Sequence, residues 1–211
     1  MKKALVIIAI VAAAATSASA QNLSVTAGYL NSIQQTSVNS VISTNNAVKA
    51  NGFYAGIGAE KAFNSYFGLA TGLCYSFLTS SSSVSASTIA TASSKTNEHY
   101  FTLPVHFTVG VPVVKDVRVF LEAGPAANIG LASSTTGSAS VLGINASTSG
   151  DNYGENSNYT RFDVLLGGIA GVQIKNIRIF GGYNRGLMDR NKSDNAKLYR
   201  SEIVAGVAFC L

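Results

Sequence analysis

The chain has 211 residues, with 15 Lys and Arg against 10 Asp and Glu, for a formal net charge of +5. The basic residues are scattered rather than clustered, so the charge pattern does not predict nucleic-acid binding. Charged residues make up only 12% of the sequence and 20 residues are Gly. This composition fits either a secreted soluble β-domain or a protein whose outer face meets lipid, and the strand pattern favours the second.

The first 20 residues predict a cleavable secretory signal. Two lysines precede a short apolar stretch over residues 5–15, and Ala18 and Ala20 occupy the −3 and −1 positions of a cleavage site. Cleavage there leaves one domain, residues 21–211, with no Cys at its start and hence no expected lipid anchor. That domain has no run of about 20 apolar residues, so we expect no transmembrane helix.

The remaining chain predicts eight β-strands, because apolar and polar residues alternate with a period of two. The clearest strand places Leu69, Leu73 and Tyr75 on one face, opposite glycines and small residues. Tilted strands of about 9–11 residues cross an outer-membrane bilayer, and several of these are that long. The expected strands cover residues 21–32, 52–62, 67–79, a hairpin over 97–131 that turns at 112–117, and 158–174, 177–187 and 196–211.

The connections between these strands alternate in length. Three long connections are rich in Ser, Thr or Asn and are expected to be loops, whereas the others are short turns. The long connections are residues 31–51, 80–96 and 132–157, and a shorter charged loop spans 189–195. Long loops on one side and tight turns on the other are typical of outer-membrane barrels. The sequence therefore predicts an all-β, eight-stranded antiparallel up-and-down transmembrane β-barrel, whose long loops are candidate contacts for a surface partner.

Aromatic residues on the lipid-facing side are expected to form two belts, as at two membrane interfaces. The belt near the long loops holds Phe53, Tyr75, Phe77, Phe101, Phe162, Tyr183 and Tyr199, and the belt near the turns holds Phe67, Phe107 and Phe209. Pro104 and Pro125 interrupt the central hairpin, and we expect a bulge or kink at each. Cys74 and Cys210 fall on strands well apart in the order, so we do not expect a disulfide.

Three short motifs resemble those of the porin-like outer-membrane β-barrel domain family. They are Tyr100-Phe101-Thr102-Leu103-Pro104-Val105, Leu121-Glu122-Ala123-Gly124-Pro125 and Phe180-Gly181-Gly182-Tyr183-Asn184-Arg185-Gly186-Leu187. The resemblance covers residues 21–211 and implies a small eight-stranded barrel in the outer membrane of a Gram-negative cell. It also implies outer-membrane lipid and the barrel-insertion machinery as partners. One departure is the last residue, which is Leu211, whereas such barrels commonly finish on an aromatic residue.

Several charged and polar side chains fall on the inward face of the expected strands. They are Glu60, His106, Glu122, Arg161, Asp163, Gln173, Arg178, Arg200 and Glu202. These residues either line a polar path for a solute or form a charge-balanced plug. An eight-stranded barrel is just wide enough for side chains to fill, so we favour the plug, with Arg161 and Asp163 pairing with Arg200 and Glu202.

The sequence predicts no catalytic, cofactor-binding or metal site. His99 and His106 are the only histidines, no Ser shares the face of His99 nearby in its strand, and neither GxSxG nor CxxC occurs. A lipid hydrolase is therefore less favoured. A soluble lipocalin-like barrel is less favoured because the chain has no Trp, which lipocalins usually carry in their first strand. We expect a non-enzymatic outer-membrane protein with a structural or surface-interaction role through its loops and a filled lumen. A narrow porin or solute-binding barrel is the alternative.

Overall fold

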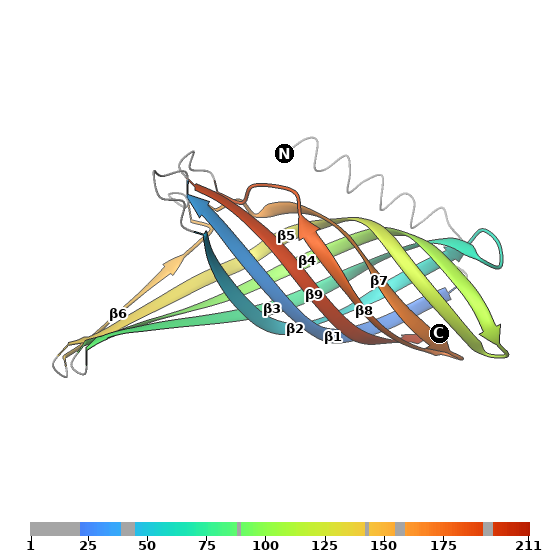
Figure 1. The fold of residues 1–211 in the computed structure, drawn as a ribbon, viewed down its shortest axis with the longest axis horizontal. Helices are drawn as coiled ribbons and strands as arrows, with labels where there is room; N and C mark the ends of the chain where they lie inside the picture. Colours follow the sequence, from blue (N-terminus) through green and yellow to red (C-terminus); the bar gives the residue numbers. More distant parts are fainter. Residues whose placement is uncertain (1–21, 39–44, 88–89, 142–143, 155–158, 192–195) are drawn as a thin grey trace.

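The computed structural model describes residues 22–38, 45–87, 90–141, 144–154, 159–191 and 196–211 (Figure 1). The signal segment expected over residues 1–20 lies outside these ranges. The described chain forms nine β-strands. They are β1 (Asn22–Val38), β2 (Asn45–Ala62), β3 (Phe67–Ser87), β4 (Ala90–Val114), β5 (Val117–Val141), β6 (Ile144–Asp151), β7 (Phe162–Ile174), β8 (Ile177–Gly186) and β9 (Ala196–Cys210).

Eight of these strands close into an up-and-down barrel, which confirms the predicted fold class. Each pairs antiparallel with its neighbours in the order β1-β2-β3-β4-β5-β7-β8-β9, and β9 pairs back with β1. The first and last strands meet over a long ladder, from Ser24 opposite Cys210 to Val38 opposite Ala196. The remaining strand, β6, pairs with β5 outside the ring. Among the described residues, no helix is long and apolar enough to cross a membrane.

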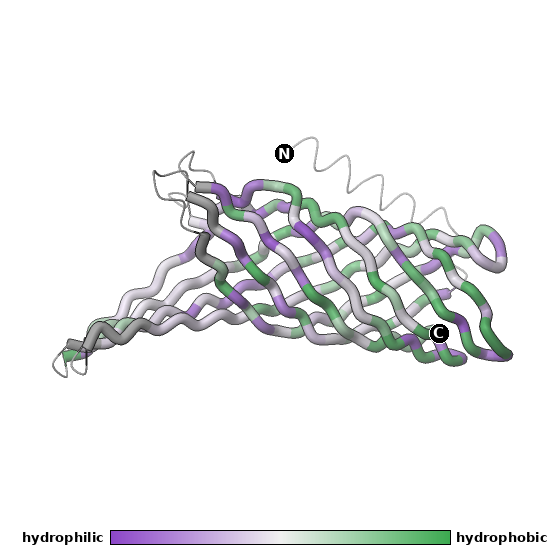
Figure 2. Tube along the Cα trace, in the orientation of Figure 1, coloured by the Kyte–Doolittle hydropathy of each residue, from purple (hydrophilic) through white to green (hydrophobic). Residues whose placement is uncertain are grey.

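The two faces of the barrel wall carry the side chains that the alternation predicts. On β3, Leu73 is 42% exposed on the outer face, whereas Ser76 and Leu78 are buried in the lumen. The same holds on β5, where Leu121 points outward and Phe120 and Glu122 point inward. Hydrophobic residues gather on the barrel wall, whereas the long extension is mostly pale (Figure 2). A closed ring with an apolar outer surface is the arrangement that lipid requires, because it leaves no unpaired strand edge.

The aromatic side chains of the outer face meet across neighbouring strands at two heights. Near the long-loop end, Phe53 lies 5.7 Å from Phe77, and Tyr75 lies 6.1 Å from Phe101, measured between ring centroids. His99 joins this group, with its Nδ1 2.6 Å from the Tyr75 hydroxyl. Near the turn end, the rings of Phe67 and Phe107 stack at 5.8 Å, so these pairs lie at the two heights expected of the belts.

The long polar connections expected to be loops are largely β-strand, so that expectation was wrong. Residues 31–38 and 45–51 extend the β1–β2 hairpin, while β3 and β4 stay paired up to Ser87 opposite Ala90. The third connection continues β5 and adds β6 as its hairpin partner. Hydrophobic periodicity misses the outer parts of β3 and β4 and all of β6, because successive residues there are exposed and Ser and Thr occupy both faces alike.

These extensions form one structure, which we call the polar ribbon: residues 80–87, 90–96, 133–141 and 144–151. It consists of the outer parts of β3, β4 and β5 together with β6, paired in that order. Figure 1 shows it running out from the end of the barrel opposite the short turns. β4 and β5 have 25 residues each, far more than the roughly 9–11 needed to cross the bilayer, so the ribbon stands well clear of the apolar wall.

Pro104 and Pro125 do not shift the register of the central hairpin, which corrects the bulge expected at each. Pairing of β3 with β4 is interrupted opposite Leu103 and Pro104 and then resumes in the same register. Pairing of β4 with β5 is likewise interrupted beside Pro125 and resumes unchanged. Proline removes one ladder donor, so it leaves a gap rather than an inserted residue. The register of β4 against β5 shifts instead between His99 and Tyr100, near the start of the ribbon, and between Pro112 and Val114, beside the turn.

Candidate functional site in the barrel lumen

Polar and charged side chains cross the lumen near the short turns in what we call the turn-side cluster: Glu60, His106, Arg118, Glu122 and Arg178. Alternation turns all five inward from β2, β4, β5 and β8. Arg178 bonds to the Glu60 carboxylate and reaches Glu122 Oε1 at 3.3 Å. Arg118 Nη1 lies 3.0 Å from Glu60 Oε1, and His106 Nδ1 lies 3.8 Å from Glu122 Oε2. Each carboxylate thus has an arginine partner, as burial demands.

A second set, the loop-side cluster, lies in the lumen nearer the long connections: Glu98, Tyr100, Arg190, Arg200 and Glu202. Arg200 is only 1% exposed, forms an ion pair with Glu202, and stacks over the Tyr100 ring at 4.1 Å. Arg190 Nη2 lies 3.7 Å from Glu98 Oε1, and its guanidinium lies 5.6 Å from the same ring. The Tyr100 ring is therefore flanked by the guanidinium groups of Arg190 and Arg200, and cation–π attraction stabilises both groups there.

The connection between β6 and β7 places Tyr153 over this cluster. Tyr153 is buried and accepts a hydrogen bond from Arg190 Nη2 at 3.2 Å. Its ring and hydroxyl occupy the space that a side chain at Gly130 would fill, so a larger residue there would have to displace Tyr153. Burial raises the pKa of the Tyr153 hydroxyl, and the neighbouring Arg190 opposes that rise. Tyr153 thus helps to cover the loop end of the barrel.

Seven of the nine residues predicted to point inward are deeply buried in the lumen. They are Glu60, His106, Glu122, Asp163, Arg178, Arg200 and Glu202. Gln173 is half-buried and accepts a hydrogen bond from Arg178 Nε at 2.9 Å. Arg161 was predicted wrongly, because β7 begins only at Phe162. It is exposed, and its guanidinium lies 5.1 Å over the Tyr153 ring instead of in the lumen.

The predicted network, in which Arg161 and Asp163 pair with Arg200 and Glu202, is therefore only partly present. Arg200 and Glu202 pair with each other. The Asp163 carboxylate instead accepts a bond from the backbone N–H of Met188 at 3.3 Å. The partners that sequence reasoning missed are Glu98, Arg190 and Tyr153. Strand alternation does place Glu98 on the inward face, but Arg190 and Tyr153 lie in connections, where no periodic signal exists.

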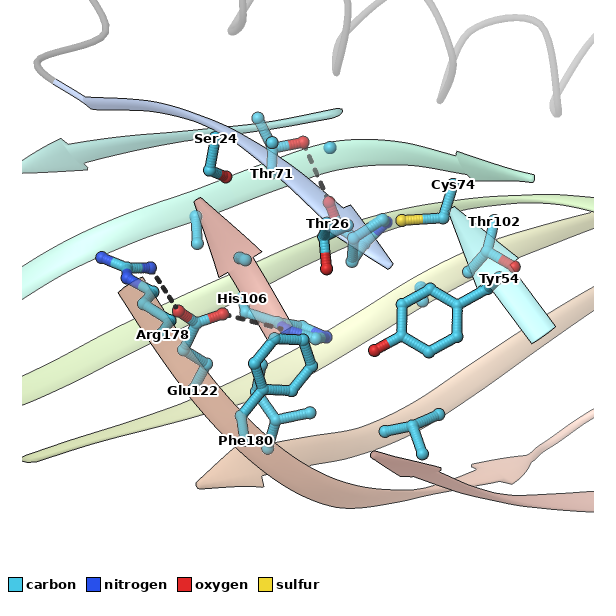
Figure 3. A pocket seen from close by; sticks show the side chains of 18 of the residues that line it. Ser24, Thr26, Tyr54, Thr71, Cys74, Thr102, His106, Glu122, Arg178 and Phe180 are labelled. Atoms are coloured by element: carbon cyan, nitrogen blue, oxygen red, sulfur yellow. Dashed lines mark hydrogen bonds and ion pairs between the residues drawn. The ribbon is translucent and has the colours of Figure 1, made fainter. Parts of the chain in front are cut away.

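Between the two clusters the lumen holds a cavity of about 160 Å³ (Figure 3). Tyr54 reaches across it from β2, and its ring and hydroxyl fill the space beside Gly28 and Gly206. Phe120 and Phe180 also line the cavity, and His106 borders it from the turn-side cluster. The cavity is therefore mainly apolar, with polar groups at its ends.

The remaining candidates for chemistry lie apart from one another. His99 belongs to the outer aromatic belt, and His106 to the turn-side cluster. Cys74 and Cys210 are both free thiols. Across the ranges that the structure describes, no three His, Cys, Asp or Glu side chains are grouped to hold a metal ion.

The fold and its charged lumen match a known class of membrane protein. The chain belongs to the outer membrane protein β-barrel domain family, whose sequence profile matches residues 16–190. It is accordingly an integral β-barrel protein of the cell outer membrane, as the sequence motifs implied. No curated protein matches the chain.

Several solved structures are similar to this chain at low identity. Ail, the attachment invasion locus protein of Yersinia pestis, is 18% identical, with 89% of this chain and 98% of that chain covered and a TM-score of 0.37. Neisserial surface protein A is 16% identical, with 89% and 96% covered and a TM-score of 0.41. The outer membrane protein OprG from Pseudomonas aeruginosa is 8% identical, with 90% and 95% covered and a TM-score of 0.35.

Proposed function

We propose that this protein is a non-enzymatic surface protein in which a closed barrel holds the polar ribbon outside the cell for contact with a partner. The observation that carries the proposal is the ribbon itself. Outer-membrane barrels place their short turns in the periplasm and their long connections outside, and the ribbon lies at the long-connection end. Backbone pairing of four strands holds the extension together along its length, which makes it a suitable platform for recognition.

The ribbon offers two strand edges to a partner. Within the described residues, β3 beyond Thr79 pairs only with β4, and β6 pairs only with β5. Both edges therefore present unpaired backbone N–H and C=O groups, which can accept a further strand. Charges and prolines usually protect such edges, yet the ribbon has only Lys95 and Asp151 as charged residues and no proline. Strand addition is the mode of contact that this surface favours.

The two charged clusters support a scaffold rather than a channel. Ion pairs of the turn-side cluster link β2, β5 and β8, and the loop-side cluster links β4 to β9 and to Arg190 in the connection between β8 and β9. Arg178 bridges carboxylates of β2 and β5, so ion flow past it requires breaking buried ion pairs. We therefore expect conductance near zero in planar bilayers. A steady, charge-selective conductance would favour the narrow porin instead.

The ribbon can be removed without touching the barrel. An Asn-Gly turn would join Ser80 to Thr96 in place of residues 81–95, and a second would join Ser134 to Asp151 in place of residues 135–150. Both joined pairs are already cross-strand partners, so each turn closes an existing hairpin. A matched control would carry an Asn-Gly turn in the Phe63–Tyr66 connection on the opposite side.

The test compares Gram-negative cells that display the full, ribbonless or control protein at equal surface amounts. Retention of the cells on mucin, on animal-cell monolayers and on one another is measured. The proposal expects the full and control proteins to raise retention several-fold on at least one surface, and the ribbonless protein to lose that gain. Equal retention by the full and ribbonless proteins on every surface would refute the surface role.

A further inference from the structure

The cavity between the two clusters has the size and lining of a small-molecule site. Its volume of about 160 Å³ is close to that of an engineered protein cavity of about 150 Å³ that binds benzene. Most of its wall is apolar, and the rings of Phe120, Phe180 and Tyr54 line it. Figure 3 shows the Tyr54 phenol oxygen directed toward the side of the pocket where Phe180 and His106 lie. A single aromatic ring matches both the volume and these walls.

Two buried polar atoms of residues that line this cavity, the Tyr54 hydroxyl and His106 Nε2, have no hydrogen-bond partner among the described residues. His106 is 7% exposed and lines the cavity, and its Nε2 has no hydrogen bond to any described residue. Its Nδ1 faces Glu122 Oε2 at 3.8 Å. In a neutral imidazole with its Nδ1–H toward that carboxylate, Nε2 is an acceptor. Buried polar groups are normally hydrogen-bonded, so we expect a hydrogen-bond donor inside the cavity to bind His106 Nε2.

The charges around the cavity indicate whether the ligand that donates this hydrogen bond is charged or neutral. In the turn-side cluster, Arg118 and Arg178 balance Glu60 and Glu122. At the other end, Glu202 is paired with Arg200. The cavity therefore has neither an uncompensated cation for an anionic ligand nor a free carboxylate for a cationic one. A neutral ligand avoids the cost of adding a charge to this balanced interior.

We propose that the lumen binds a neutral one-ring aromatic molecule with a single hydroxyl, of the phenol class. The hydroxyl donates to His106 Nε2, and the ring packs among Phe120, Phe180 and Tyr54. This site is independent of the surface role of the ribbon, because it lies inside the barrel between the two clusters.

The test uses the refolded barrel in detergent micelles and two ¹⁹F NMR probes, 4-fluorophenol and fluorobenzene. The probes differ only in the hydroxyl, so their comparison isolates the bond to His106. We expect saturable binding of 4-fluorophenol and about fivefold weaker binding of fluorobenzene, as for one neutral hydrogen bond. His106→Phe should remove the difference between the probes, while Glu122 keeps its Arg178 partner.

Occupancy of the cavity is tested separately. Ala126→Leu adds bulk from a buried wall residue and should weaken both probes at least tenfold, whereas Ala123→Leu, on the lipid-facing side of the same strand, should change neither. Ala208→Leu is a second filling variant, and heat-modifiable migration on gels identifies which variants fold. Binding that never saturates, equal affinity for the two probes, or saturable binding that persists in a folded filling variant would each overturn the proposal. If neither filling variant folds, the two probes on the natural barrel still decide.

Discussion

Arg200 shows how a lipid-enclosed barrel tolerates buried charge. Its guanidinium has three favourable neighbours in the carboxylate of Glu202, the face of Tyr100 and the carboxylate of Glu98 on the opposite strand. Two of its nitrogens, Nε and Nη1, have no hydrogen-bond partner among the described residues. A buried charge that is only partly hydrogen-bonded depends strongly on the partner it has.

We therefore expect Glu202→Gln to lower the free energy of unfolding by about 3 kcal/mol, because Arg200 loses its paired charge in a dry interior. A urea titration in lipid vesicles measures this, with Asp116→Asn in an exposed turn as the control. Asp116 has φ of 65°, which Asn tolerates, so the control should change little. Conductance should remain near zero in both variants. Unchanged stability of Glu202→Gln together with a measurable conductance would contradict the plug.

Gly206 makes room for the aromatic side chain that crosses the lumen. A Cβ at residue 206 would overlap the Tyr54 hydroxyl and lie 2.9 Å from the Ala27 carbonyl oxygen. We expect Gly206→Ala to lower unfolding free energy by about 1–3 kcal/mol, as overpacking does. Gly181→Ala is the control, because its nearest neighbour would be 3.6 Å away.

The same titration measures these glycine variants. Adding Tyr54→Phe should recover part of the loss in Gly206→Ala, because it removes the overlapping oxygen. Equal stability of the two glycine variants would show that Tyr54 does not pack on Gly206.

At the scale of elements, one strand changes environment along its length. The outer face of β3 presents Leu73 and Phe77 within the apolar wall, and then Ser81 in the ribbon. A charge on this face should therefore cost stability at one height and almost nothing at the other.

We expect Leu73→Arg to destabilise the barrel by about 2–4 kcal/mol, as charges do near the bilayer midplane. Ser81→Arg, on the same face of the same strand, should stay within about 0.5 kcal/mol. Lipid-based unfolding titrations compare the two. A similar loss at both positions would contradict the boundary drawn between wall and ribbon.

Gly72 belongs to the same strand and faces the lumen. The sequence predicts a milder effect for Gly72→Ser than for Leu73→Arg unless the site is tightly packed. The structure meets that condition, since a Cβ at Gly72 would lie 2.6 Å from the Ile57 carbonyl oxygen. Strand alternation gives the direction of a side chain, but the space available to it depends on how closely the neighbouring strands approach.

Strand alternation predicted the barrel and most of its inward charges, because lipid outside and packing inside impose opposite demands on successive residues. Strand alternation alone was enough to predict that the side chains of Glu60 and Arg178 face the lumen. Strand alternation did not predict the polar ribbon, because its strands have water on both faces and its sequence does not alternate between apolar and polar residues. Tyr153 and Arg190 were not predicted either, because each enters the lumen from a connection whose path depends on the folded barrel. The three family motifs indicated the outer membrane as the location, and the matched family profile agrees.

The whole molecule consists of a barrel wall in the membrane and a polar ribbon beyond it. The apolar wall and the two aromatic heights mark the part within lipid. The ribbon and the short turns then lie on opposite sides of the outer membrane. The proposed surface role depends on this orientation, because the ribbon can contact a partner outside the cell only if it faces outward.

The most direct measurement is labelling of single cysteines on intact cells with a membrane-impermeant maleimide. In a background with Cys74→Ser and Cys210→Ser, one variant carries Ser138→Cys in the ribbon and the other Ser65→Cys in a short turn, both at exposed positions. We predict rapid labelling of Ser138→Cys on intact cells, and labelling of Ser65→Cys only after the outer membrane is permeabilised. Labelling of Ser65→Cys alone on intact cells would place the ribbon in the periplasm and contradict the account.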